Sequence, residues 1–450
     1  MGLKAIALAA ITVSLVAGEG MGIVAVAAEA MSQQAVPEVL TLEKAVDLAI
    51  SNHPSLRVAS GTQAVSEARV GQAQSGLFPQ LQARNAYQQA TANTSTSFGG
   101  GPTRRSTRGD NFGTSQSSVT LNQLLYDFGK IKSQVDAAQF NLRAANSDAE
   151  TTLQTVIVNV QQAYFGLQQA HRLVTVSDEA ITQFKKHLAL AQGRFKAGVA
   201  PKIDVTTAEV DLSNAQLNLI TARNNDLVAR VTLNNAMGIK TSDGYRVDDP
   251  TAVQHERISL DEAVAVAMRL RPEMISQQAL EQAAEVTIKT AQSDFFPTVS
   301  SSANYSYTGQ ESPFVYNWNV TGTVNIPIFS GFLTKQQVAE ARANLLKTKA
   351  NGEVLRQNIL LEVNQALLNL EAAKERLQVT AVTVTQAKER LALVEGRYRA
   401  GLSNAIEVTD AEVALVNAQV NDVVAMSNYQ AAKAQLDRAT GISTPARGGS

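Results

Sequence analysis

Three carboxylates are the residues of this chain whose types and spacing offer the clearest chemistry. Glu407 and Asp410 lie three residues apart, on one face of an expected helix, and Asp204 occupies the position equivalent to Glu407 earlier in the chain. Carboxylates that share one helix face can together attract cations. The alternative is capping of a helix N-terminus, which alone explains Glu407 but explains Asp410 less well, because Asp410 lies about one turn further into the helix.

The rest of the sequence gives no sign of a catalytic site. No His is paired with Ser or Cys in a recognisable motif, and no Gly-rich phosphate loop is present. Cysteine is absent, which excludes disulfides and thiolate metal sites. His171 and His187 are expected to be polar surface residues rather than metal ligands. We therefore expect no enzyme activity, no cofactor and no metal site, and the formal net charge of -1 suggests no nucleic-acid partner.

The carboxylates belong to a segment that occurs twice. Residues 397–420 read RYRAGLSNAIEVTDAEVALVNAQV and residues 194–217 read RFKAGVAPKIDVTTAEVDLSNAQL, with about 13 of 24 positions identical and no gap. Each copy predicts a reversal between two helices, in which Gly198 or Gly401 takes the left-handed conformation that ends a helix. The chain is therefore a duplicated unit with two equivalent tips, at about 194–204 and 397–407.

The next helix is expected to start differently in the two copies. Pro201 fits the first helical position of copy one, and Asn404 with Glu407 forms a capping-box pair in copy two. The helices that lead to the tips have no Pro and little Gly, and about 70 residues make each roughly 100 Å long. Long helices are expected at 129–197 and 331–400, with shorter ones at 54–77, 204–236, 272–295 and 407–439.

Strands are expected after Phe78-Pro79 and Phe296-Pro297, where the helical period is lost. Residues 316–328 alternate apolar and polar side chains with period two, as a strand does that crosses a bilayer between lipid and a wet interior. A soluble hairpin remains the alternative. Tyr305, Tyr307, Tyr316 and Trp318 cluster where membrane-interface aromatics would lie. The sequence predicts two β-hairpins, at about 79–127 and 297–328, with strands at 81–90, 117–126, 298–308 and 316–328.

The order of the chain follows from these features. Residues 1–30 have the layout of a secretory signal peptide, with Lys4, an apolar run and small residues at its end, and a retained membrane anchor is the alternative. A first repeat is expected at 31–250, a second at 251–443, and a short tail at 444–450.

Four strands cannot close a barrel, and lipid excludes open sheet edges. Several identical chains must therefore complete it.

The chain resembles the TolC family of outer-membrane efflux and secretion ducts. The resemblance lies in both tip motifs, in the Phe-Pro pairs that precede the strands, and in the segments that follow the hairpins, LYDFG (125–129) and PIFSG (327–331). The resemblance covers nearly the whole chain after the signal peptide. It implies a mainly α fold with a membrane β portion, built from two long and four shorter coiled-coil helices and two hairpins. It further implies a homotrimer with one 12-stranded β-barrel in outer-membrane lipid and a periplasmic helical tunnel.

By this resemblance, the helix tips bind a periplasmic adaptor and open to pass substrate from an inner-membrane pump. The resemblance places the pore gate at Glu407 and Asp410, with Asp204 and Tyr398 nearby. It places adaptor docking at Gly198, Val199, Val205, Gly401, Leu402 and Val408. One departure is Ser403, where the family often has a basic residue, so Tyr398, Lys202 or Arg399 are expected to substitute in the closed state. The alternative function is a structural or adhesive coiled-coil protein of the envelope that does not conduct.

Overall fold

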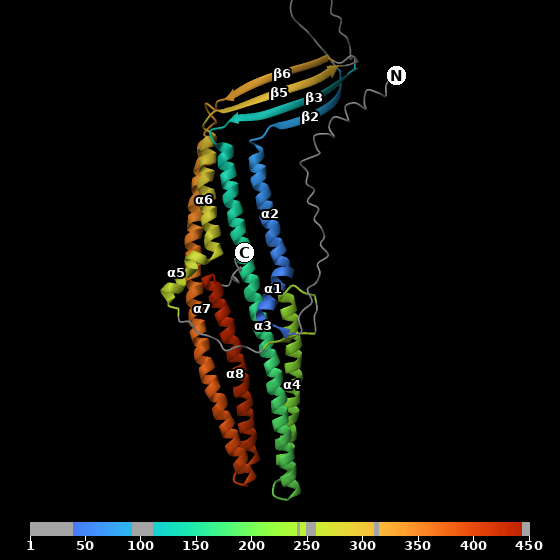
Figure 1. Ribbon diagram of the computed structural model, residues 1–450, viewed down its shortest axis with the longest axis vertical. Coiled ribbons are helices and arrows are strands. Elements are labelled where there is room, and N and C mark those ends of the chain that lie inside the picture. Colours follow the sequence, from blue (N-terminus) through green and yellow to red (C-terminus); the bar gives the residue numbers. More distant parts are fainter. Residues whose placement is uncertain (1–38, 92–110, 241–243, 249–257, 310–314, 443–450) are drawn as a thin grey trace, which may run out of the picture.

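The computed structural model describes residues 39–91, 111–240, 244–248, 258–309 and 315–442. The expected signal peptide and the C-terminal tail lie outside the described residues. A curved sheet lies at one end of an elongated array of helices, and two helical tips lie at the other end (Figure 1). The tips that carry Asp204 and Glu407 are therefore the part of the chain furthest from the sheet.

In the described part of the chain, eight helices repeat in two sets of four, which agrees with the duplication in the sequence. The long helices α3 and α7 have 67 residues each. The two sets are α1 (Leu42–Asn52), α2 (Pro54–Ser75), α3 (Lys130–Lys196) and α4 (Lys202–Ala236), then α5 (Leu260–Leu270), α6 (Pro272–Ser293), α7 (Leu333–Arg399) and α8 (Ala405–Thr440). The two long and four shorter helices expected from the sequence are confirmed. Helices α1 and α5 were not among them.

A proline at the start of the second helix causes the corner between α1 and α2 and the corner between α5 and α6. Pro54 and Pro272 occupy the first turns of α2 and α6. The preceding residues, His53 and Arg271, adopt extended backbone with ψ of 126° and 124°, because a proline disfavours helical backbone in the residue before it. Each short helix is thus separated from its longer neighbour by one extended residue.

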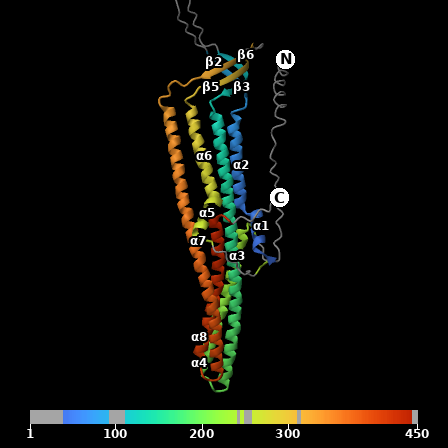
Figure 2. The same ribbon diagram turned by 60° about the vertical axis from the view of Figure 1, so that its left-hand side comes forward.

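Helix α3 is the central element of the helical array. Helix α2 packs beside its half nearest the sheet and α4 beside its half nearest the tip (Figure 1). On its other side α3 contacts α6 and α8, as the view in Figure 2 also shows. Alanine dominates the buried positions, so the helices pack closely through thin seams. Many Leu and Val side chains of α4 and α7 stay exposed in the single chain.

The four strands expected from the sequence form one antiparallel sheet in the order β2-β3-β5-β6. Strand β3 pairs with β5 and so joins the two halves of the chain. The last strand ends at Asn325 rather than at Ile328, because Pro327 lacks the N–H that a sheet ladder requires. The strands are β2 (Gln80–Thr91), β3 (Asn111–Tyr126), β5 (Thr298–Gly309) and β6 (Val315–Asn325). A short parallel pair, β1 (Val39–Leu40) with β4 (Arg246–Val247), was not expected from the sequence.

Two glycines pack the ends of α4 and α8 against the corners described above. Gly238 and Gly441 have φ of 70° and 78°, in the left-handed region that favours glycine. A Cβ on Gly238 would lie 2.8 Å from the Cα of His53, and one on Gly441 would lie 3.1 Å from the backbone N of Arg271. The repeat has kept this close approach in both halves.

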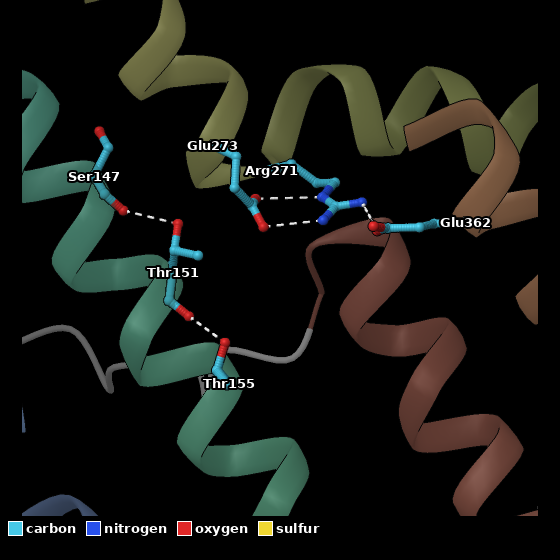
Figure 3. A network of polar contacts seen from close by, with 6 residues as sticks. All are labelled: Ser147, Thr151, Thr155, Arg271, Glu273 and Glu362. Carbon is cyan, nitrogen blue, oxygen red and sulfur yellow. Dashed lines mark hydrogen bonds and ion pairs between the residues drawn. The ribbon is translucent and has the colours of Figure 1, made fainter. Parts of the chain in front are cut away.

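Arg271 ties the second corner to α7 (Figure 3). Its guanidinium donates to Glu273 of α6 at 2.9 Å and to Glu362 of α7 at 2.5 Å, and the Arg271 side chain is buried. Burial raises the pKa of Glu273, but the bonds and charge of Arg271 outweigh this effect and leave that pKa below its ordinary value. The nearby hydroxyls of α3 bond to carbonyls of their own helix, as Thr155 does to Thr151.

Replacing Arg271 with Met is expected to lower the free energy of unfolding by about 1–3 kcal/mol, because two carboxylates lose their counter-charge in a poorly hydrated place. Both partners keep some exposure, which limits the loss. Thermal unfolding of the purified protein measures it. The control is Lys349→Ala, which breaks an exposed pair with Glu285 and is expected to change stability by less than about 1 kcal/mol. Equal melting temperatures for the two variants would contradict a stabilising role of Arg271.

Candidate functional site at the helix tips

Both tips end their incoming helix in the way that the repeated glycine predicts. Gly198 and Gly401 have φ of 75° and 76°. The backbone N–H of Val199 donates to the carbonyl of Arg194 at 3.0 Å, and that of Leu402 donates to Arg397 at 2.8 Å. This pattern satisfies carbonyls at the helix end that otherwise have no partner. The two reversals therefore have the same backbone.

The outgoing helices start differently, and one expectation was wrong. Pro201 is the N-cap of α4, with extended backbone, rather than its first helical residue. In α8, the side chain of Asn404 accepts a hydrogen bond from the N–H of Glu407 at 2.9 Å, as expected for an N-cap. The carboxylate of Glu407 accepts a bond from Ser403 at 2.5 Å and lies 4.0 Å from Arg397. Ser403 thus orients an acidic residue.

The structure places the predicted gate residues at one end of the molecule but in different environments. Asp410 is exposed, and Glu407 and Asp204 are partly exposed. Tyr398 is only 1% exposed. Its ring lies under the guanidinium of Arg194, which is 4.4 Å from the ring centroid and also donates to the carbonyl of Tyr398. A gate role for Tyr398 would therefore act through contacts between the two tips and not through an exposed ring.

Of the expected docking residues, most but not all are on the surface. Gly198, Val199, Gly401 and Leu402 are exposed, and Val205 is partly buried. Val408 is an exception: it is 1% exposed and packs with Tyr398, Ala405 and Leu190. It lies on the face of α8 that packs against α3 and α7, so with the tips in this arrangement it is not part of their surface.

A buried polar cluster behind the tips was missed by the sequence analysis. Glu412 of α8 is 1% exposed and His187 of α3 is 4% exposed, with 3.9 Å between His187 Nδ1 and Glu412 Oε1. Gln183 donates to Glu395 of α7 at 2.5 Å and to Glu412 at 3.5 Å. The expectation that His187 lies on the surface was wrong, because α8 packs over it. His171, in contrast, is exposed as expected.

Burial shifts the pKa values of both members of this cluster toward neutrality. Burial raises the pKa of Glu412 to about 8, against the effect of its bond from Gln183, and the charges of Glu395 and Asp211 raise it further. Burial lowers the pKa of His187, although the charges of Asp211, Glu395 and Asp204 act in the opposite direction. At neutral pH the pair is therefore largely uncharged.

At the other end of the molecule, the four predicted interface aromatics come together. Tyr305 pairs with Trp318 and Tyr307 with Tyr316 across β5 and β6, so all four share one face of the sheet. The rings of Tyr307 and Tyr316 have centroids 6.4 Å apart, and the Tyr305 and Tyr307 hydroxyls are 3.0 Å apart. All four are exposed. Among the helices of the described ranges, none has the length and hydrophobicity needed to cross a membrane.

The chain is a paired helical array that ends in two exposed tips and carries an open antiparallel sheet at its far end. Comparisons with known proteins show the class to which this arrangement belongs. The family model for outer membrane efflux proteins matches residues 45–239 and 264–442. The chain is 23% identical over 390 residues to the probable efflux pump outer membrane protein TtgC of Pseudomonas putida, covering 84% of this chain and 78% of TtgC. It is also 23% identical over 403 residues to the outer membrane protein TolC of Escherichia coli, covering 84% of this chain and 77% of TolC.

A crystal structure of CusC shares the fold, with a TM-score of 0.79 at 17% identity, covering 89% of this chain and 92% of CusC. The chain belongs to the outer membrane efflux protein family. It is an outer-membrane channel-tunnel of a Gram-negative bacterium, and this family is a class of transport channels rather than of enzymes. The matches favour conduction over the alternative of an adhesive envelope coiled coil.

Proposed function

We propose that three copies of this chain form one outer-membrane duct, which exports small molecules or proteins when an adaptor at the helix tips couples it to an inner-membrane pump. The single observation that carries an assembly of several copies is the open sheet, and the family supplies the number three. Within the described residues, the outer strands β2 and β6 each pair with one neighbour and leave one edge unpaired. Unpaired edges in lipid leave backbone groups without hydrogen bonds, and three four-stranded sheets joined edge to edge remove them.

The exposed apolar side chains of α4 and α7 support the same assembly. Leu217, Leu227 and Val231 of α4, and Leu346 and Leu368 of α7, are exposed in the single chain. By helical spacing they recur along one face of each helix, and an apolar stripe left exposed in a single copy favours contact with another chain. In a trimer these faces would pack between neighbouring copies and form the tunnel wall, with Tyr305, Tyr307, Tyr316 and Trp318 at the membrane interface.

The adaptor is proposed to bind the exposed tip residues, Gly198, Val199, Gly401 and Leu402, with Val205 at their margin. Glu407 and Asp410 of the three copies would then form acidic rings at the mouth of the tunnel, with Asp204 nearby. Tyr398 would hold the two tips of each copy together from inside.

Membrane fractionation with chemical cross-linking tests this function. We expect the protein in the outer-membrane fraction as a trimer that dissociates on heating, and we expect the purified trimer to conduct in planar bilayers. A monomer in the soluble periplasmic fraction would contradict the proposal. A membrane-bound trimer that does not conduct would contradict the export function but not the assembly.

A further inference from the structure

The buried pair Glu412 and His187 has no role in the acidic rings or in the docking surface, and its geometry is unusual for a structural contact. Glu412 Oε1 is 3.9 Å from His187 Nδ1 and accepts one long bond from Gln183. Its second oxygen, Oε2, is buried and has no hydrogen-bond partner among the described residues. A buried ionised carboxylate without partners is strongly disfavoured, whereas a protonated carboxyl carries no charge.

This pair lies at a junction of three helices. His187 belongs to α3, Glu412 to α8 and Glu395 to α7, and together they line a cavity of about 300 Å³. The ring of His187 stacks with that of Tyr398, with centroids 5.9 Å apart. The α3–α4 hairpin and the α7–α8 hairpin meet through these side chains just behind their tips.

We propose that Glu412 and His187 form a proton-controlled latch that holds the α7–α8 hairpin against α3. When both groups are neutral they can stay buried together. When the hairpins separate, water reaches both groups and each returns to its ordinary protonation equilibrium. The role of this latch in opening depends on the channel function proposed above, but the latch itself does not.

The other charged groups around the pair leave this assignment unchanged. Glu395 of α7 accepts bonds from Gln183 at 2.5 Å and from Arg399 at 2.9 Å, so Arg399 is already paired. Asp211 of α4 accepts from Thr409 at 3.1 Å. Lys186 of α3 also lines the cavity, and Asp204 of α4 and Tyr398 of α7 complete the titratable groups that face the pair.

The pH dependence follows from counting protons in the latched and open states. In the open state the ordinary pKa values of 4.5 for Glu412 and 6.5 for His187 apply, whereas in the latched state the pKa of Glu412 is about 8 and that of His187 is lowered. Just below pH 6.5 the open state gains a proton on His187 while the latched state keeps one on Glu412, so both states hold about one proton and the latch is nearly insensitive to pH. From pH 6.5 to about 8 the latched state holds one proton more, so the latch weakens as pH rises.

Hydrogen–deuterium exchange of the purified full-length protein tests the latch without needing an adaptor, a pump or conduction. Exchange of residues 181–196 and 405–416, corrected for the intrinsic effect of pH, is expected to be slow at pH 6, where the latched state keeps its proton on Glu412. It is expected to be about tenfold faster or more at pH 8, since one proton changes the equilibrium tenfold per pH unit.

Glu412→Gln removes the alkaline response, and the exchange should then stay flat from pH 6.5 to 8. His187→Gln keeps the alkaline response and extends it below pH 6.5. The matched control is Glu209→Gln, at the equivalent position of α4, where the side chain is exposed and the wild-type profile should remain. An identical pH profile in the wild type and Glu412→Gln would overturn the latch. A channel that fails to conduct while its exchange follows the expected profile would overturn the proposed function and leave the latch in place.

Discussion

Replacing Glu407 and Asp410 together with alanine is expected to abolish block of the closed mouth by multivalent cations and to weaken cation selectivity in planar bilayers. In the proposed trimer each position would contribute three carboxylates, and those that lie within a Debye length of about 8 Å at physiological salt would have fields that add. The apparent affinity for a trivalent blocker should fall about tenfold or more, which corresponds to about 1.4 kcal/mol.

The structure separates this effect from helix capping. Asn404 caps α8 through the backbone N–H of Glu407, and this bond does not use the Glu407 carboxylate. Glu407→Gln therefore keeps the cap and removes a charge, and it should reproduce part of the loss. Glu209→Gln, on an exposed part of α4, is the matched control and should behave as the wild type. If the double alanine variant keeps its selectivity and its block, the two acids are helix-end residues only, and the gate lies at Asp204 and Tyr398.

Gly238→Ala is expected to cause the largest loss of stability among single substitutions at the repeated turns. The residue has φ of 70°, and its added Cβ would lie 2.8 Å from the Cα of His53 and 3.0 Å from the His53 nitrogen. Left-handed backbone costs a residue other than glycine about 1–3 kcal/mol, and a backbone overlap cannot be relieved by turning a side chain. We expect a total of about 3 kcal/mol and a lower melting temperature, measured for the purified protein at one scan rate.

Two further alanine variants locate the cause. Gly441→Ala tests the equivalent corner, where the approach to Arg271 is looser at 3.1 Å, and it should lose less. Gly166 lies inside α3, and beyond the local helix backbone an added Cβ would meet nothing within 4 Å, so Gly166→Ala should be neutral or stabilise by up to about 1 kcal/mol. A melting temperature for Gly238→Ala at or above that of Gly166→Ala would show that the corner tolerates the added carbon.

The elements could be predicted from the sequence because their ends are set by local chemistry. Gly198 and Gly401 end their helices through bonds to the preceding turn, and Pro54 and Pro272 start theirs, without help from distant residues. The strand after Pro297 shows the same locality, since β5 starts at Thr298. The prediction was wrong at Pro201, where a proline can either precede a helix as its N-cap or occupy its first helical position. In the structure Pro201 is the N-cap of α4.

The surroundings of the site residues could not be predicted from the sequence. Segments of identical sequence in the two halves pack against different neighbours. Residues 208–210 and 411–413 both read AEV, yet Glu209 is exposed and Glu412 is buried. Phe195 is 44% exposed, whereas its counterpart Tyr398 is 1% exposed. Helix α8 packs on α3 as well as on α7, and these contacts bury Glu412, His187 and Val408. They join segments far apart in the sequence, so no local motif predicts them.

Helices α3 and α7 have 67 residues each, and this equality limits how the distance between the sheet and the tips can change during evolution. Both helices run from the same sheet to adjacent tips, so an insertion in one alone would shift its tip along the axis by about 1.5 Å per residue and rotate it by about 100° per residue. Such a change would separate His187 from Glu412 and Arg194 from Tyr398. Viable length variants must therefore alter both halves together, in steps of about seven residues, which restore the helical face.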